Sequence, residues 1–284
     1  MAKKTSKSFC TAPKRWAFGA LAGVALLGLG PAKAAELVEL EYEVYFGGMH
    51  IVSAKASLQK GSQNYRISSE ATTQGMLKWM FGWTGNGKSV GAITPKGLQP
   101  VEHSHNSLSD DKTREVKIDY NPGGKVEFQV KDSDPDSDEY RRTPLDLATI
   151  DNTIDPMSAI LSMSRNLESG HECVGEFPIF DGQRRYNITL THREPKMIEA
   201  TEYSVFSGEA VGCEVKIEQI GGFWKKPSKY SKGARNRVIW VARPIPESPP
   251  VPVKLNVQTK MGTLVAHLTR VRVGGRELAL RIED

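Results

Sequence analysis

Cysteine is scarce in this sequence, and its scarcity limits the chemistry that thiols could perform. Only three cysteines, Cys10, Cys173 and Cys213, occur among 284 residues. A structural zinc site takes about four clustered cysteine or histidine ligands, and a redox centre usually has a Cys-x-x-Cys pair. Neither pattern is present. We therefore expect no metal and no cofactor.

Histidine is also rare. We expect no metalloprotease pattern His-Glu-x-x-His, no nucleophile elbow Gly-x-Ser-x-Gly and no phosphate-binding glycine loop. Of six histidines, His103 and His105 stand at i and i+2, which on a strand places both on one face. Without a nearby cysteine or carboxylate motif, we interpret them as solvent-facing residues rather than as metal ligands. We predict no catalytic residue and do not expect an enzyme.

Long apolar runs are absent after residue 34. The run that does occur, residues 16–30, follows five cations and ends at Ala32-Lys33-Ala34. This layout is typical of a secretory signal peptide over residues 1–34, and the run is short for a membrane span, which needs about 20 residues. A retained anchor is the alternative. We expect cleavage after Ala34, export across the inner membrane, no remaining transmembrane span, and a single β-rich domain over residues 35–284.

An excess of positive charge is missing from the predicted mature chain. The whole sequence has 38 Lys and Arg against 33 Asp and Glu, a formal charge of +5. Residues 1–34 hold six of these cations and no acid, which leaves 32 basic and 33 acidic residues, a formal charge of −1. A nucleic-acid partner is therefore not expected.

One local concentration of positive charge remains, in residues 224–237. This segment contains four lysines, two arginines and two aromatic residues. Such runs are usually solvated, and we expect a basic hairpin loop. The functional alternative is an interaction module that binds anionic lipid, glycan or a protein of the envelope.

Export would leave Cys173 and Cys213 as an even pair in an oxidising compartment, where a disulfide is the default. The stretch that begins at Cys173, CVGEFPIFDGQRRY, then contains a strand and a hairpin turn at Asp181-Gly182. Arg184 and Arg185 are candidate polar contacts. They would point to opposite faces of a strand, so at most one could meet Asp181 or a ligand.

Alternation of apolar and polar residues dominates the mature chain. Clear cases are Leu37–Phe46, Glu115–Tyr120 and Ala210–Ile220, and turn signals such as Gly47-Gly48 and Gly221-Gly222 separate the runs. This pattern predicts an all-β, mainly antiparallel protein with a large curved sheet or open barrel.

Two segments depart from the alternation. Asp155 at the N-cap and Pro156 at the first helical position predict one α-helix over about residues 155–167. Its expected docking face is Met157, Ile160, Leu161 and Met163. The segment Gly75–Gly85 is short and very apolar and could plug one end of a barrel.

The apolar residues of this second segment are Met76, Leu77, Trp79, Met80, Phe81 and Trp83. Packing in the core is the simpler interpretation and the one we favour. The alternative is an adaptable apolar cleft for a lipid or acylated partner, because methionine and aromatic clusters suit such sites.

Four stretches, YEVYFGGMHIVSAKASL, IDPMSAILSMSR, CVGEFPIFDGQRRYNITL and GCEVKIEQIGGF, together with the signal peptide, resemble the family catalogued as domain of unknown function 3108 (DUF3108). The likeness runs roughly from Val38 to Val273. The resemblance implies an exported protein of the Gram-negative periplasm with a curved sheet or open barrel, similar to periplasmic lipoprotein carriers and envelope-integrity proteins. It supplies no catalytic residues.

Together these features predict a non-enzymatic periplasmic binding or scaffold protein in cell-envelope maintenance, with an apolar cleft for a lipid or acylated partner. Two alternatives stay open. One is an envelope hydrolase that acts on glycan or peptide, and the other is a protein-interaction module that uses residues 224–237.

Overall fold

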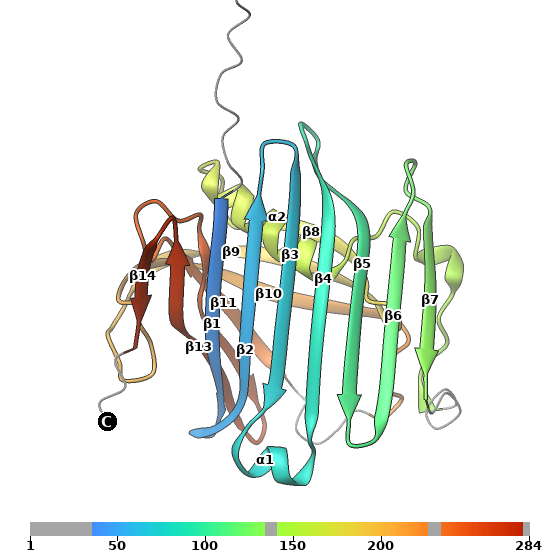
Figure 1. The fold of residues 1–284 in the computed structure, drawn as a ribbon, viewed down its shortest axis with the longest axis horizontal. Coiled ribbons are helices and arrows are strands. Elements are labelled where there is room, and N and C mark those ends of the chain that lie inside the picture. Colours follow the sequence, from blue (N-terminus) through green and yellow to red (C-terminus); the bar gives the residue numbers. More distant parts are fainter. Residues whose placement is uncertain (1–35, 134–140, 227–233, 281–284) are drawn as a thin grey trace, which may run out of the picture. The chain divides into compact units, whose positions relative to one another are not determined.

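The structure is a computed structural model that describes residues 36–133, 141–226 and 234–280 (Figure 1). The predicted signal peptide and the centre of the basic loop, residues 227–233, lie outside the described residues. The described strands are β1 (Glu36–Phe46), β2 (Met49–Lys60), β3 (Asn64–Thr73), β4 (Trp83–Thr94), β5 (Gly97–Ser109), β6 (Lys112–Tyr120), β7 (Val126–Asp132), β8 (Gly175–Phe180), β9 (Arg185–Ile198), β10 (Gly208–Gly221), β11 (Arg235–Ala242), β12 (Val251–Thr259), β13 (Gly262–Val273) and β14 (Arg276–Ala279). The helices are α1 (Gly75–Met80), the 3-10 turn η3 (Leu147–Thr149) and α2 (Pro156–Glu168).

All named strands belong to one sheet, and every pair of neighbouring strands is antiparallel. The order is β7-β6-β5-β4-β3-β2-β1-β13-β12-β11-β10-β9-β8, and β14 pairs with the end of β13. Strands β1 to β7 therefore follow one another from the centre of the sheet to one edge. The chain then passes through η3 and α2 to β8 at the opposite edge, and β9 to β13 lead back to the centre, where β13 pairs with β1. The predicted all-β, antiparallel curved sheet is confirmed.

The two outermost strands of this order, β7 and β8, do not pair with each other. The segment before α2 instead covers β8, because Ile154 donates a backbone hydrogen bond to Pro178 (2.9 Å) and accepts one from Phe180 (3.1 Å). Phe180 also meets Phe128 of β7 edge to face, with ring centroids 5.0 Å apart. Side chains rather than a hydrogen-bonded ladder join the two ends, so the sheet stays open.

Helix α2 begins as predicted. The Asp155 carboxylate accepts hydrogen bonds from the backbone N–H groups of Met157 (3.0 Å) and Ser158 (2.9 Å), and Pro156 stands at the first helical position. Its predicted docking face was partly wrong, because Ile160 is 48% exposed. The sheet contacts the helix from β5 and from β8, and the buried positions are Ser158, Ala159, Leu161, Met163 and Ser164.

Glycines of β4 let α2 and β3 approach this strand closely. A Cβ atom on Gly87 would lie 3.4 Å from the Met157 sulfur of α2. A Cβ atom on Gly91 would lie 2.5 Å from the Tyr65 hydroxyl, closer than van der Waals contact allows. Gly91 therefore has no room for a side chain, whereas a Cβ atom on Gly87 would just contact α2.

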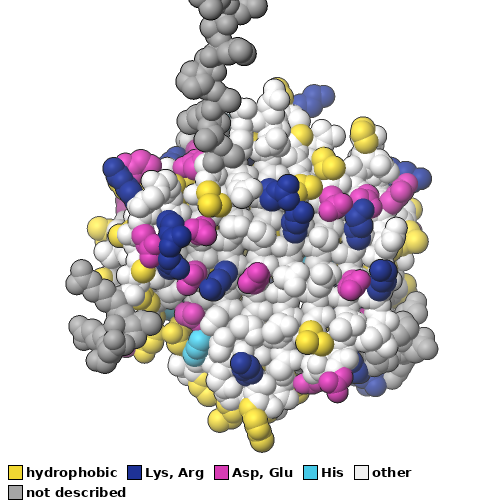
Figure 2. All heavy atoms as spheres, viewed as in Figure 1, with side chains coloured by type: hydrophobic (Ala, Val, Ile, Leu, Met, Phe, Trp, Pro, Cys, Tyr) yellow, Lys and Arg dark blue, Asp and Glu magenta, His cyan; other side chains and the backbone are white. Residues whose placement is uncertain are grey.

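The face formed by β1 to β6 is polar and mixed in charge. Lys and Arg side chains alternate there with Asp and Glu (Figure 2). Lys117 of β6, for example, lies between Glu102 of β5 (3.4 Å) and Asp119 (2.9 Å). Such exposed pairs stabilise the fold only modestly, and they leave no single-sign patch on this face.

Candidate functional site

An apolar cleft of about 590 Å³ lies at the end of the sheet where β1 turns into β2 and β12 turns into β13. Its walls come from the β1–β2 hairpin, from α1 and the residue after it, from the residue before β11, and from the ends of β12 and β13. The lining residues are Phe46, Met49, His50, Ile51, Met76, Leu77, Met80, Phe81, Ala234, Val257, Thr259 and Leu264.

Four of the six predicted apolar residues line this cleft, namely Met76, Leu77, Met80 and Phe81. Trp79 does not and is 86% exposed, and Trp83 lies in β4 with its ring over Gly85. The favoured interpretation as core was wrong for Met76, Trp79, Met80 and Phe81, which are at least half exposed. The reason is the length of α1: six residues packed on β2 and β3 at the end of the sheet cannot bury all their side chains.

The remaining walls come from residues that the sequence did not single out. Phe46 pairs with Met49 across the β1–β2 hairpin and with Leu264 of β13, and Leu264 pairs with Val257 of β12. The sequence signal that could have indicated these walls was the pair of apolar residues, Phe46 and Met49, on either side of the Gly47-Gly48 turn. Only the strand register brings β1, β12 and β13 together at this place.

His50 is the one ionisable side chain in the described lining. Its Nε2 atom contacts the Glu43 carboxylate, and Glu43 also accepts a hydrogen bond from the Ser53 hydroxyl at 2.7 Å. The Tyr45 ring lies beside the imidazole, with centroids 5.3 Å apart. His50 is thus already satisfied by protein groups, and the rest of the lining is almost wholly apolar.

The two candidate arginines lie elsewhere and bind the protein itself. Asp181 turns the β8–β9 hairpin: its carboxylate accepts the backbone N–H of Gln183 (3.1 Å) and of Arg184 (2.7 Å), and it pairs with the Arg184 guanidinium at 2.7 Å. Arg185 donates instead to the Thr149 carbonyl at 2.8 Å. Only Arg184 meets Asp181, as expected, and neither arginine lines the cleft.

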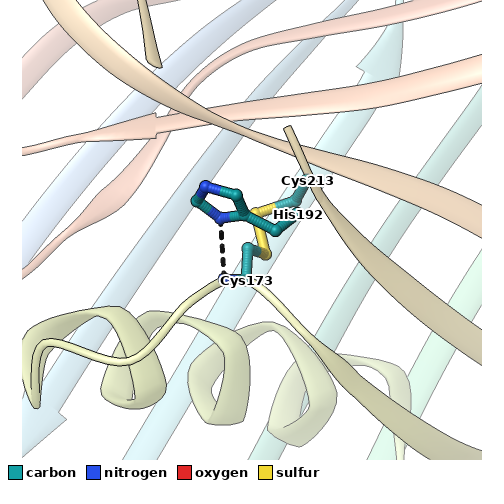
Figure 3. The surroundings of a disulfide bond; sticks show 3 residues. All are labelled: Cys173, His192 and Cys213. Atoms are coloured by element: carbon teal, nitrogen blue, oxygen red, sulfur yellow. Dashed lines mark hydrogen bonds between the residues drawn. A yellow bond between two sulfur atoms is a disulfide. The ribbon is translucent and has the colours of Figure 1, made fainter. Parts of the chain in front are cut away.

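The predicted disulfide between Cys173 and Cys213 is confirmed (Figure 3). The two Cα atoms are 5.5 Å apart, and the bridge links the segment after α2 to β10. His192 of β9 pairs with Cys213 in the sheet and accepts the Cys173 backbone N–H at 3.3 Å. Both cysteines are buried in a cluster with Met163 and Leu190, so the bridge is part of the scaffold.

The prediction of solvent-facing histidines was wrong: His105 is half-buried beside His103, with ring centroids 5.6 Å apart, and His103 is buried. The register that pairs His103 with Ser89 turns both toward α2. The Ser89 hydroxyl lies 2.8 Å from His103 Nδ1 and 2.6 Å from Asp155 Oδ1. On the other carboxylate oxygen, Asp155 accepts the Ser158 hydroxyl at 2.5 Å, and Ser158 in turn meets the Tyr65 hydroxyl at 2.7 Å.

Serine, histidine and aspartate suggest a hydrolytic triad, but their geometry does not form one. Ser89 and Asp155 both approach the same ring nitrogen of His103, at 2.8 and 3.5 Å. A triad needs the serine and the carboxylate on opposite ring nitrogens, so that the imidazole can take the proton from one side while held from the other. Ser89 and Asp155 are moreover fully buried. The cluster anchors α2 to β4 and β5.

The segment Gly82–Gly91 (GWTGNGKSVG) matches the letters of two catalytic motifs, so the expectation that the sequence contains neither of them was wrong. It fits the phosphate loop Gly-x4-Gly-Lys-Ser and the nucleophile elbow Gly-x-Ser-x-Gly. Both motifs act at a turn from a strand into a helix. Here the residues lie in antiparallel β4, paired with β3 and β5, so neither motif has its functional context.

Two features are absent from residues 36–133, 141–226 and 234–280. No helix there is long and apolar enough to cross a membrane. No group of three or more His, Cys, Asp or Glu side chains there is arranged to hold a metal ion. The expected basic loop was wrong at its C-terminal side, where Arg235–Arg237 belong to β11. On the N-terminal side, the Arg142 guanidinium lies 4.0 Å from the Trp224 ring centre.

Comparison with known proteins gives three findings. No curated protein matches the chain. A solved structure, the β-barrel-like protein of domain of unknown function DUF1849 from Brucella abortus, is similar over 86% of this chain and 100% of its own, with a TM-score of 0.46 and 8% sequence identity. The family model described as "Protein of unknown function (DUF3108)" matches residues 41–269, which are most of the chain, and the protein therefore belongs to the DUF3108 family.

Proposed function

We propose that this chain is a non-enzymatic binding protein whose cleft takes up an acyl chain of a lipid or of an acylated partner. The observation that carries the proposal is the lining of the cleft. Ten of its twelve described residues are apolar, and the two exceptions are His50 and Thr259. A volume of about 590 Å³ lies within the range of about 300–1,000 Å³ that is typical of ligand sites.

The chemistry of the lining favours a hydrocarbon over a polar ligand. A polar group that leaves water for this cleft would find few hydrogen-bond partners, because His50 is held by Glu43. Met49, Met76 and Met80 supply flexible side chains, which can adapt to chains of different length and curvature.

The proposal places this activity in the periplasm, in maintenance of the cell envelope, after removal of residues 1–34. The disulfide between Cys173 and Cys213 supports export, because such bridges persist in oxidising compartments and are rare in the cytosol. Expression with the native N-terminus, cell fractionation and intact-mass measurement test it. We expect a periplasmic protein that begins at Ala35, and a cytosolic protein of full mass would refute this part.

The hydrolase alternative has weaker support. No carboxylate belongs to the described lining of the cleft, and Glu43 beside it is occupied by His50 and Ser53. The buried Ser89 cluster lacks the geometry of a triad. A binding role needs neither a nucleophile nor a general base, and it fits the site as it stands.

Fluorescence of cis-parinaric acid, a polyene fatty acid, tests the cleft directly. We expect saturable enhancement with the wild type. Val257→Trp, which fills the cleft from β12, should weaken binding by about tenfold or more, since each 1.4 kcal/mol of lost burial is a factor of ten. The matched control is Val101→Trp on β5, which does not line the cleft and should bind as the wild type does.

Two further measurements protect this test against misfolding. Each variant is melted to confirm a native transition, and Leu264→Asp, which places a charge in the lining, gives an independent loss of binding. Lipids extracted from the purified protein are also identified by mass spectrometry. Absence of both probe binding and co-purifying lipid in the wild type would overturn the proposed function.

A further inference from the structure

The mouth of the cleft carries a group of large apolar side chains that the fold leaves in water. They come from α1 and from the two hairpin turns beside it, and each is at least half exposed. We call them the apolar tip: Met49, Met76, Trp79, Met80, Phe81 and Met261. In Figure 2 hydrophobic side chains project at the lower end of the view, where α1 lies in Figure 1.

Trp79 distinguishes the tip from the wall of a closed pocket. Its side chain is 86% exposed and does not belong to the lining, whereas its neighbours Met76 and Met80 belong to both the lining and the tip. Folding gains almost nothing from a tryptophan in this position, because burial is what makes apolar surface stabilising. Its exposure is explained if the side chain is buried against something outside the chain.

The charges around the tip suit a surface of lipid headgroups. Residues 74–83 hold a single charged residue, Lys78, and Lys260 adjoins Met261 in the β12–β13 turn. Two acids, Asp110 and Asp111, lie in the neighbouring β5–β6 turn, where Asp110 donates its backbone N–H to Gly82 at 2.9 Å. Lysine beside tryptophan is characteristic of segments at the membrane interface, where the ring lies at headgroup depth and the ammonium meets phosphate.

We infer that the apolar tip inserts into the surface of a lipid bilayer and presents the mouth of the cleft to the acyl chains there. The inference extends the proposed function by naming where the cleft would load and unload, and it rests on that function for its purpose. A second copy of this chain is a poorer occupant. The tip has six side chains, whereas a stable protein interface has about 20–30 residues on each side.

Flotation with vesicles of phosphatidylethanolamine and phosphatidylglycerol tests the inference. The protein is expressed with its own N-terminal segment, so that this segment is identical in all variants. Loss of one buried tryptophan should lower the partition coefficient of Trp79→Ser by about tenfold. Met76→Ser should lower it by a smaller factor. The matched control is Met197→Ser, because Met197 is exposed to 71% and Met76 to 70%, and Met197 lies near the end of β9, outside the cleft.

A second readout locates the inserted residue. Brominated lipids quench a tryptophan that enters the bilayer, so the wild type should be quenched. Trp79→Phe should still float with vesicles but lose most of this quenching, while Trp224→Phe should keep it. Equal flotation of the wild type and Trp79→Ser, or unchanged quenching in Trp79→Phe, would overturn the inference. A wild-type dimer that Trp79→Ser converts into a monomer, without vesicle binding, would also overturn it and assign the tip to self-association.

The proposed cleft function and the proposed membrane insertion can be refuted independently of each other. Trp79 does not line the cleft, so Trp79→Ser should bind cis-parinaric acid in solution as tightly as the wild type. Loss of vesicle docking with intact probe binding refutes the tip alone. Vesicle docking by a wild type that binds no probe refutes the cleft alone.

Discussion

The Ser89 hydroxyl in the middle of β4 donates a 2.6 Å hydrogen bond to the Asp155 carboxylate, which caps α2 and lies 66 residues further along the chain. The same carboxylate oxygen also accepts both backbone N–H groups of the first helical turn. One buried group therefore starts the helix and fixes it to the sheet. Loss of this group should affect secondary and tertiary structure at once.

Replacement of Asp155 by alanine should lower the free energy of unfolding by about 3 kcal/mol, because a helix cap and buried hydrogen bonds disappear together. Urea denaturation followed by circular dichroism measures this. Asp146→Ala is a matched control, since Asp146 caps η3 at an exposed site through Ala148 (2.9 Å). Its cost should stay below about 1 kcal/mol. Equal losses in both variants would contradict the anchoring role of Asp155.

Stability should fall as the solution becomes acidic. Burial, helped by the neighbouring His103, lowers the pKa of His105 to about 4, and burial, helped by Lys254, lowers the pKa of His267 to about 4, from an ordinary value of 6.5. Between about pH 6.5 and pH 4, these histidines are therefore protonated in the unfolded chain but neutral in the folded chain. The free energy of unfolding decreases across this range as the pH falls.

The urea midpoint between pH 7.5 and 4.5, measured at constant ionic strength, tests this dependence. We expect a decline that is smaller in His267→Gln, which has no imidazole to protonate in the unfolded state. A midpoint that stays constant or rises as the pH falls would contradict the assignment of neutral buried histidines.

Removal of the disulfide should destabilise the protein strongly. Cys173 and Cys213 are 40 residues apart, and the chain-entropy relation gives about 4 kcal/mol for a loop of this length. Thermal melting of the double variant Cys173→Ser/Cys213→Ser, with wild type in the presence and absence of dithiothreitol, measures the loss. Identical melting of the oxidised and reduced wild type would contradict it. Binding of cis-parinaric acid at low temperature should persist, because neither cysteine lines the cleft.

A methyl group on Gly91 should be poorly tolerated. Its Cβ atom would lie 2.5 Å from both the Tyr65 hydroxyl and the Gln99 carbonyl, and overpacking of this kind costs about 1–3 kcal/mol. Gly82→Ala is the control, because the nearest atom to a Cβ there is the Lys78 carbonyl at 3.5 Å. Chemical denaturation should show little change in Gly82→Ala, and an equal change in the two variants would contradict the close approach.

Local signals predicted what local interactions determine. Asp155 and Pro156 marked the helix start, and glycine turns with alternating strands gave the fold class. The sequence predicted a bridge between Cys173 and Cys213 because Cys10 lies in the segment that we expect to be removed. The burial of His103 and the position of the cleft depend on the pairing of strands, which the sequence did not predict. His103 turned inward because it pairs with Ser89, and the cleft exists because β1 meets β13. The letters of Gly82–Gly91 likewise have no catalytic meaning once they form a strand.

The central place of β1 has a consequence for how the protein folds. Val38 near the start of the described chain pairs with Val273 near its end, whereas β1 to β7 can add to one another as successive hairpins. Contacts that close such long loops form late and make folding slow. A chain that emerges N-terminus first would therefore hold half a sheet with an unpaired β1 edge until its last strands arrive. The join between β1 and β13 makes completion of the sheet, and with it the cleft, the final step of folding.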